Sequence, residues 1–191
     1  MAGPKQKVTS AWARVKKDIL LPDAVLKRAA KDAATAQVDV IRQRALVGLG
    51  PNGKPFRRNS KEWTAYKRKI MSGKVKYPEW AKKTALAMTD PKQVGRLTGR
   101  TIADFTFTGI KTRRSGSMIE LSWSLGVRST RRVRGITSAK LVEILEKRHR
   151  IKLFGASTAG HYKVREEEAI RAVLRKSLAL NPGASHQLTV D

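Results

Sequence analysis

A strict alternation of apolar and polar residues between positions 119 and 127 constrains the fold of this chain more than any other feature. The apolar positions are Ile119, Leu121, Trp123, Leu125 and Val127, and the residues between them are Glu120, Ser122, Ser124 and Gly126. A period of two is typical of a strand with one buried face. Residues 105–108 alternate in the same way. The basic segment at residues 111–116 is therefore predicted to link two strands of a hairpin.

A long helix is predicted ahead of this hairpin. Pro22 and Asp23 suit a first helical turn and the positive end of the helix dipole, and Gly48 and Gly50 end the helical pattern. Spacings of three and four place the apolar residues on one face. These residues are Leu26, Ala30, Ala34, Val38, Ile41 and Ala45. The small alanines would allow close approach of a neighbouring backbone.

Three shorter helices complete the expected fold. Ser60 is expected to cap a helix that carries Trp63, Tyr66 and Ile70, and Thr137 or Ser138 to cap another at residues 141–145. The last helix is expected to start at Glu166, Glu167 and Glu168, because acidic side chains favour a helix N-terminus. Its apolar face would consist of Ile170, Val173, Leu174 and Leu178.

These elements predict an α+β fold, with a long N-terminal helix and C-terminal helices packed on a small antiparallel sheet or hairpin. Residues 22–180 would form a single domain, within which the irregular residues 73–94 are an insertion. Residues 1–21 and 181–191 are expected to be an N-terminal arm and a C-terminal tail.

The charge of the chain points to a polyanionic partner. Lys and Arg number 41 against 15 Asp and Glu, a formal net charge of +26 on 191 residues. Nucleic acid is the first candidate for a partner that offsets such a surplus. A hydrophobic content of 40% is too high for a wholly disordered basic chain. No apolar run approaches the ~20 residues needed to cross a bilayer, and the polar N-terminus lacks the core of a signal peptide, so we expect no membrane association.

Catalytic, metal-binding and cofactor-binding residues are not expected. The chain has no cysteine, and its three histidines share no metal-ligand spacing. The glycine pattern at residues 48–55 resembles a phosphate-binding loop, but a predicted helix precedes it and Pro55 stands where that loop needs Ser or Thr. A structural turn is the favoured interpretation, and we expect that the protein is not an enzyme.

Two basic groups flank the predicted hairpin and are the candidate nucleic-acid or partner contacts. Lys111, Arg113 and Arg114 would lie at the turn end, and the second group would lie at the opposite end: Arg128, Arg131, Arg132 and Arg134. Two interpretations remain open. The groups form either a solvated basic surface or a non-specific contact to duplex phosphates. The Trp and Phe residues are expected mostly in the core rather than stacked on bases.

Several short motifs occur along the chain in an order that resembles the order found in the tail-completion and virion-morphogenesis proteins of tailed bacteriophages. A helix ending in Ile-Arg-Gln-Arg at 41–44 precedes Gly-Lys-Pro-Phe at 53–56. Asn59, Ser60, Tyr66 and Lys67 follow, then Leu-Thr-Gly-Arg at 97–100 leads into the hairpin. Leu-Phe-Gly-Ala-Ser at 153–157 precedes the last helix. The similarity covers residues 26–180, and the segment at 73–94 is longer than the usual linker.

This resemblance implies a structural virion protein of the neck or tail, assembled in the host cytoplasm. Its expected partners are further copies of itself in a ring, the neighbouring head–tail connector and tail terminator or tube proteins, and genomic double-stranded DNA in the lumen. The family has no known catalytic residues. A free, non-specific nucleic-acid-binding protein is the alternative.

Overall fold

The computed structural model describes residues 9–16, 21–76, 87–93, 100–115, 118–128, 136–149, 151–179 and 188–190. Within these ranges the chain forms five helices and four strands, which confirms the predicted α+β class. The strands are β1 (Thr9–Lys16), β2 (Phe105–Ser115), β3 (Met118–Val127) and β4 (Leu188–Val190). The helices are α1 (Asp23–Leu46), α2 (Lys61–Met71), α3 (Arg100–Ala103), α4 (Ser138–His149) and α5 (Gly160–Ser177).

The described chain forms two compact units. The sheet unit lies within Val8–Ile41, Thr106–Gly126 and Gly155–Asp191, and the helical unit lies within Arg42–Phe105 and Val127–Phe154. Helix α1 contributes to both units.

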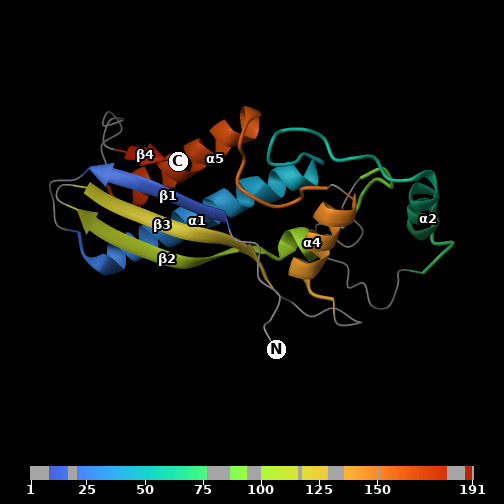
Figure 1. Cartoon of the computed structure of the whole chain (residues 1–191), viewed down its shortest axis with the longest axis horizontal. Helices are drawn as coiled ribbons and strands as arrows, with labels where there is room; N and C mark the ends of the chain where they lie inside the picture. Colours follow the sequence, from blue (N-terminus) through green and yellow to red (C-terminus); the bar gives the residue numbers. More distant parts are fainter. Residues whose placement is uncertain are drawn as a thin grey trace. The chain divides into compact units, whose positions relative to one another are not determined.

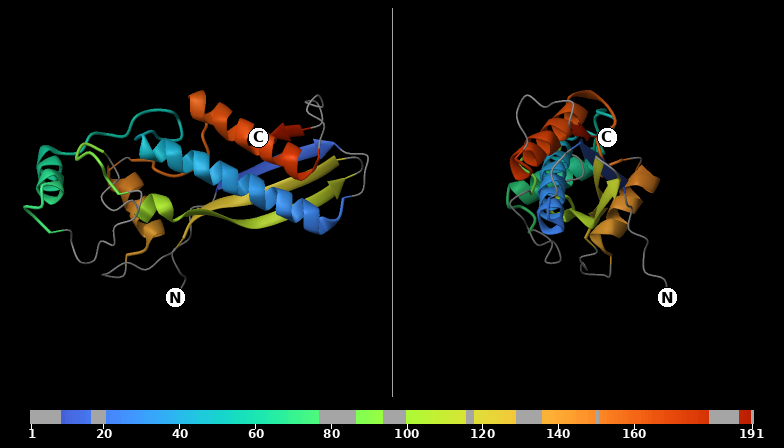
Figure 2. Two further views of the ribbon diagram at one scale, coloured as in Figure 1. Left: turned by 180° about the vertical axis from the view of Figure 1, so that it is seen from behind. Right: turned by 90° about the vertical axis from the view of Figure 1, so that its left-hand side faces the viewer.

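The sheet unit is a four-stranded sheet with the order β2-β3-β1-β4. Strand β1 is antiparallel to both β3 and β4, and Ala13 of β1 lies opposite Leu121 of β3. Helices α1 and α5 cover the same face of this sheet (Figures 1 and 2). The alternating residues of β3 point into this layer, where Trp123 is 1% exposed.

Helix α1 packs closely because one of its faces is built from small residues. Ala29, Ala30, Ala33 and Ala34 are all fully buried, and so is the predicted apolar stripe from Leu26 to Ala45 apart from a slight exposure of Val38. Alanine allows close backbone approach and has the highest helix propensity. The predicted helix and its end at Gly48, whose φ is +83°, are confirmed.

The helical unit contains α2, α3 and α4. Hydrogen bonds from side chains to the backbone hold the segment around α3 in place. Arg42 Nη2 donates to the carbonyl oxygens of Ala103 (3.1 Å) and Phe105 (2.7 Å). Asp104 accepts from the Ser138 hydroxyl, and the rings of Phe105 and Phe154 pack with centroids 4.9 Å apart. These contacts fix the corner at which the chain enters the hairpin.

Both predicted helix caps are confirmed. The Ser60 side chain accepts from the Trp63 amide at 3.1 Å at the start of α2, and Thr137 Oγ1 accepts from the Lys140 amide at 3.1 Å at the start of α4. Each bond satisfies an amide that has no partner within the helix.

Four predicted segments differ from the structure. Residues 111–115 are not a link but the end of β2, because pairing with β3 continues through this basic sequence. The segment treated as an N-terminal arm contains β1, an inner strand of the sheet, and the segment treated as a tail contains the short strand β4. Helix α5 starts at Gly160, so Glu166 lies six residues inside it and the acidic run is not the helix start.

Candidate nucleic-acid and partner interface

The predicted turn-end group lies on β2, but its members do not share one face. Gly109 has φ +60° within the strand, which is typical of a bulge that shifts the alternation of side chains. Beyond it, Ile110 faces α1 and Arg114 reaches the start of α1. Alternation therefore places Lys111 and Arg113 on the opposite, open face of the sheet.

Arg114 is already engaged within the protein. Its Nη2 lies 2.9 Å from Asp23 Oδ1 and also donates to the Leu21 carbonyl. An ion pair as exposed as this one contributes little stability, but it ties the end of β2 to the first turn of α1. Arg114 thus contributes less free positive charge to a partner than Lys111 and Arg113, which are both exposed.

The second predicted group is only partly described. Arg128 directly follows β3, is exposed, and donates its amide to the Asp104 carbonyl at 2.8 Å. Arg131, Arg132 and Arg134 lie outside the described residues.

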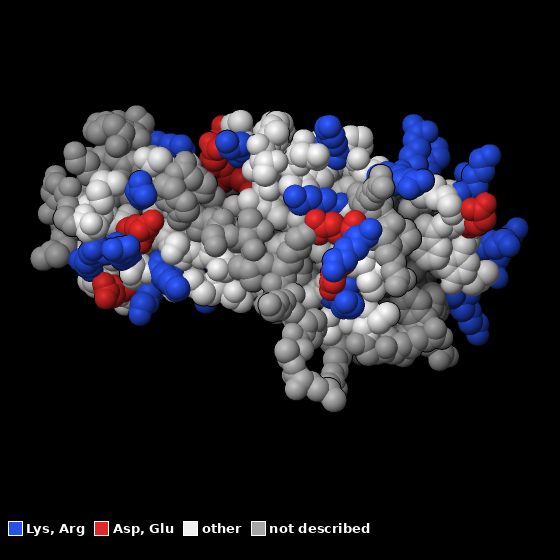
Figure 3. Space-filling model, in the orientation of Figure 1, with Lys and Arg blue, Asp and Glu red and all other residues white. Residues whose placement is uncertain are grey.

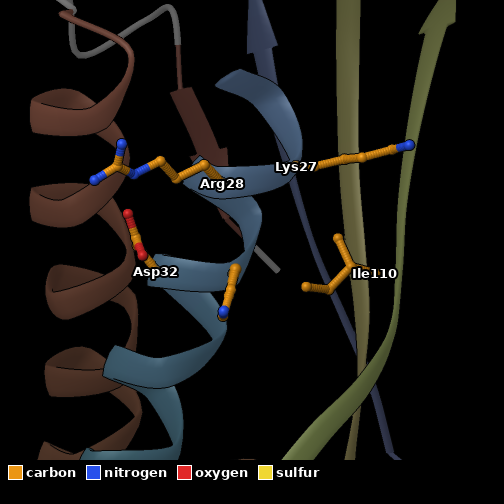
Figure 4. Close-up of a pocket in the computed structure, with 5 residues that line it drawn as sticks. Lys27, Arg28, Asp32 and Ile110 are labelled. Atoms are coloured by element: carbon orange, nitrogen blue, oxygen red, sulfur yellow. The ribbon is translucent and has the colours of Figure 1, made fainter. Parts of the chain in front are cut away.

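A further set of charged residues lines an open depression of about 620 Å³ along the first turns of α1. Lys27 and Ile110 lie on the strand side of α1, whereas Arg28 and Asp32 point toward α5 (Figure 4). Because these cations diverge and an acid lies among them, the depression is poorly suited to a single anionic ligand.

Among the described residues, the densest basic surface lies around α2 and was not predicted from the sequence. We define the α2 basic surface as the eight exposed Lys and Arg residues between positions 54 and 76: Lys54, Arg57, Arg58, Lys61, Arg68, Lys69, Lys74 and Lys76. The same segment has only one acidic residue, Glu62. Basic side chains project around α2 in the space-filling view (Figure 3).

An aromatic pair lies within the α2 basic surface. Trp63 stacks on Tyr66, with ring centroids 5.3 Å apart and an interplanar angle of 20°. Trp63 is 41% exposed and is an exception to the expectation that the Trp and Phe residues lie mostly in the core, whereas Trp123 is buried.

Helix α2 is held by the loop at residues 87–93. Asn59 Nδ2 lies 3.2–3.3 Å from the carbonyl oxygens of Pro91, Lys92 and Gln93. Lys67 is 1% exposed, and its ammonium group donates to the same Gln93 carbonyl. The loop is in turn closed by Gln93 Oε1, which accepts from the Thr89 amide at 2.8 Å. Lys67 is therefore an internal support and not part of the exposed charge.

The acidic run contains a buried structural centre that the sequence analysis missed. Glu166 is 4% exposed and accepts from the amide and hydroxyl of Ser157 and from Gln37 Nε2 at 3.1 Å. Gln37 Oε1 accepts from Trp123 Nε1 at 2.8 Å, so the network joins α5, α1 and β3. The sequence contained a signal for this burial. Glu166 lies four residues before Ile170 and eight before Leu174, a spacing that places it on the same apolar face of the helix.

The described residues bear on two kinds of ligand site, a metal site and a phosphate-binding loop. No group of three or more His, Asp or Glu there is arranged to hold a metal ion. In the glycine loop, the amides of Gly50, Gly53 and Phe56 donate to carbonyl oxygens of the loop itself, and the Lys54 amide donates to Asn52 Oδ1. A phosphate-binding loop needs such amides directed at its ligand. The helix that precedes the loop is confirmed, as predicted for a structural turn.

Comparison of the chain with protein-family models, with curated proteins and with solved structures found no match. None of the helices in the described ranges is both long enough and apolar enough to span a membrane.

Proposed function

We propose that this chain is a structural, non-enzymatic subunit of the neck or tail end of a tailed-phage virion. Copies of the chain form a ring around the DNA channel, between the head–tail connector and the tail terminator or tube proteins. The ring is assembled in the host cytoplasm and remains in the virion.

The observation that carries this proposal is the structural role of the residues that resemble the tail-completion family. Arg44 is fully buried, and Phe56 and Ser157 are 9% and 8% exposed. Arg42 bonds the corner before β2, and Ser157 bonds Glu166 at the turn before α5. Residues that secure successive junctions of a fold must keep their order along the chain. The order of these motifs, which resembles that of the family, therefore supports a shared fold and, through it, a shared role.

The charge of the molecule supports the same proposal. A ring subunit around packaged DNA benefits from a positive surface, and several copies multiply a weak phosphate attraction through their high effective concentration.

An in vitro joining assay tests the proposal. Cells infected with the parent phage lacking this gene should accumulate filled heads and tails that remain separate. Added purified protein should restore joined, infective particles. A lysate that contains joined particles without the protein would contradict the proposal.

The alternative, a free non-specific nucleic-acid-binding protein, is favoured by one observation, the α2 basic surface. Such a protein would coat DNA at low salt and leave head and tail joining unchanged.

A further inference from the structure

We propose that the α2 basic surface, rather than the hairpin, is the principal binding surface for the phosphate backbone of duplex DNA. The choice of duplex DNA rests on the proposed function, since DNA passes through the neck of a tailed phage. The location of the surface rests on the structure alone.

The balance of charge distinguishes this surface from the open face of the sheet. Residues 54–76 present eight exposed cations against one carboxylate, Glu62. On the open face of the sheet, Lys111 and Arg113 are accompanied by Arg14, which lies opposite Glu120. Non-specific DNA affinity depends on the number of phosphates neutralised and needs no base-reading geometry. The larger surplus of exposed positive charge around α2 therefore predicts that this surface contributes the larger share of the affinity for DNA.

The spacing of the cations suits a phosphate backbone. Lys61 and Arg68 are seven residues apart, so they lie on one side of α2 about 10 Å apart along its axis. Arg57 and Arg58 precede the helix, and Lys74 and Lys76 follow it. Duplex DNA carries one charge per ~1.7 Å of axis, so several phosphates fall within reach of this set.

The surface is also ordered before any partner binds. Ser60 caps α2, and Asn59 and Lys67 attach this segment to the loop at residues 87–93. The backbone that presents the cations therefore needs no ordering on binding, which lowers the entropic cost of association.

Paired substitutions that remove equal charge test the location. The Kd for a 20-base-pair duplex would be measured from about 0.05 to about 0.3 M salt for the full-length protein and two double variants. One is Lys61→Gln with Arg68→Gln, and the control is Lys111→Gln with Arg113→Gln. Because the helix variant neutralises two fewer phosphates, its plot of log affinity against log salt should become less steep by about 1.8, and its affinity at about 0.1 M salt should fall at least about tenfold. The control should lose less than about threefold.

Three results would overturn the proposal: equal losses in both double variants, a larger loss in the hairpin variant, or a wild-type protein that does not bind the duplex at low salt. Urea unfolding of each variant verifies that it is folded. If the helix variant unfolds, Arg57→Gln with Lys74→Gln removes the same charge outside the helix and carries the same expectation. The joining assay is a separate readout, so failure of this inference and failure of the proposed function are distinguishable.

Discussion

Glu166 is a buried carboxylate that joins separate elements in the interior of the sheet unit. Its carboxylate accepts bonds from Ser157 and Gln37, which belong to the turn before α5 and to α1. A buried donor left without its acceptor costs about 1–3 kcal/mol. Single residues of this kind decide stability because the net free energy of folding is small.

Replacing the Glu166 side chain should therefore be strongly destabilising. Glu166→Ala is expected to lower the free energy of unfolding by about 3 kcal/mol, or the Tm by about 6–12 °C for a chain of this size. Thermal unfolding followed by circular dichroism measures this. Glu168→Ala, on the exposed side of α5, is the matched control and should change stability by less than about 0.5 kcal/mol. Similar losses in both variants would contradict the role assigned to Glu166.

Gly109 sets which residues of β2 face solvent. Its φ of +60° is unfavourable for a residue with a Cβ atom, although a Cβ there would meet Ser124 Oγ at an acceptable 3.6 Å. We expect Gly109→Ala to destabilise the protein by about 1–2 kcal/mol in urea unfolding. Gly109→Asn should lose less, because Asn tolerates this conformation better. A neutral Gly109→Ala variant would show that the strand does not need the bulge.

At the scale of elements, α4 carries a pH-dependent charge cluster. Hydrogen bonds from Lys147 (2.8 Å) and Lys140 (3.0 Å) lower the pKa of Glu143 from its ordinary value of 4.5 to about 2. Because the folded pKa is below the unfolded one, the stabilisation is present above about pH 4.5 and is lost as the pH falls toward 2.

This cluster predicts the direction in which a Glu143 substitution changes stability as the pH falls. Glu143→Gln should be slightly less stable than the wild type at pH 6, and the difference should shrink toward zero as the pH falls through 2, where the carboxylate becomes protonated. The urea midpoints of the two proteins at both pH values measure the effect. About 0.5 M salt should reduce it at pH 6, because the side chains are exposed. A difference that grows in acid would contradict the assigned pairing.

Elements with a local signal were predictable from the sequence, and elements that depend on distant partners were not. Helix α1 and strand β3 follow from their periodicity alone. Strand β1 is specified by pairing with β3 more than a hundred residues later, and β4 has only three residues. The basic end of β2 resembles a loop in composition and becomes a strand because β3 lies beside it.

The candidate site was harder to predict because charge alone does not reveal exposure. Lys67 and Arg44 have the sequence character of surface residues and are buried, whereas Trp63 is apolar and is 41% exposed. The hairpin group was selected because it flanks a clear structural signal. The larger surplus of positive charge around α2 is visible only in the structure, which shows that Lys67 is buried and that the eight cations of the α2 basic surface are exposed.

At the scale of the whole molecule, the net charge of +26 and the structural role of the shared motifs point in one direction. The charge favours a polyanionic partner, and the buried junction residues support the proposal of a structural ring subunit. Neither depends on a catalytic group.

The most direct test of the central claim is the number of copies of this chain in each purified virion of the parent phage, measured by quantitative mass spectrometry against the major tail protein. The account predicts a small fixed copy number that corresponds to one ring and is retained after a wash at about 0.5 M salt, which removes proteins bound only through phosphates. A protein that is abundant in the lysate but missing from the washed particles would contradict it.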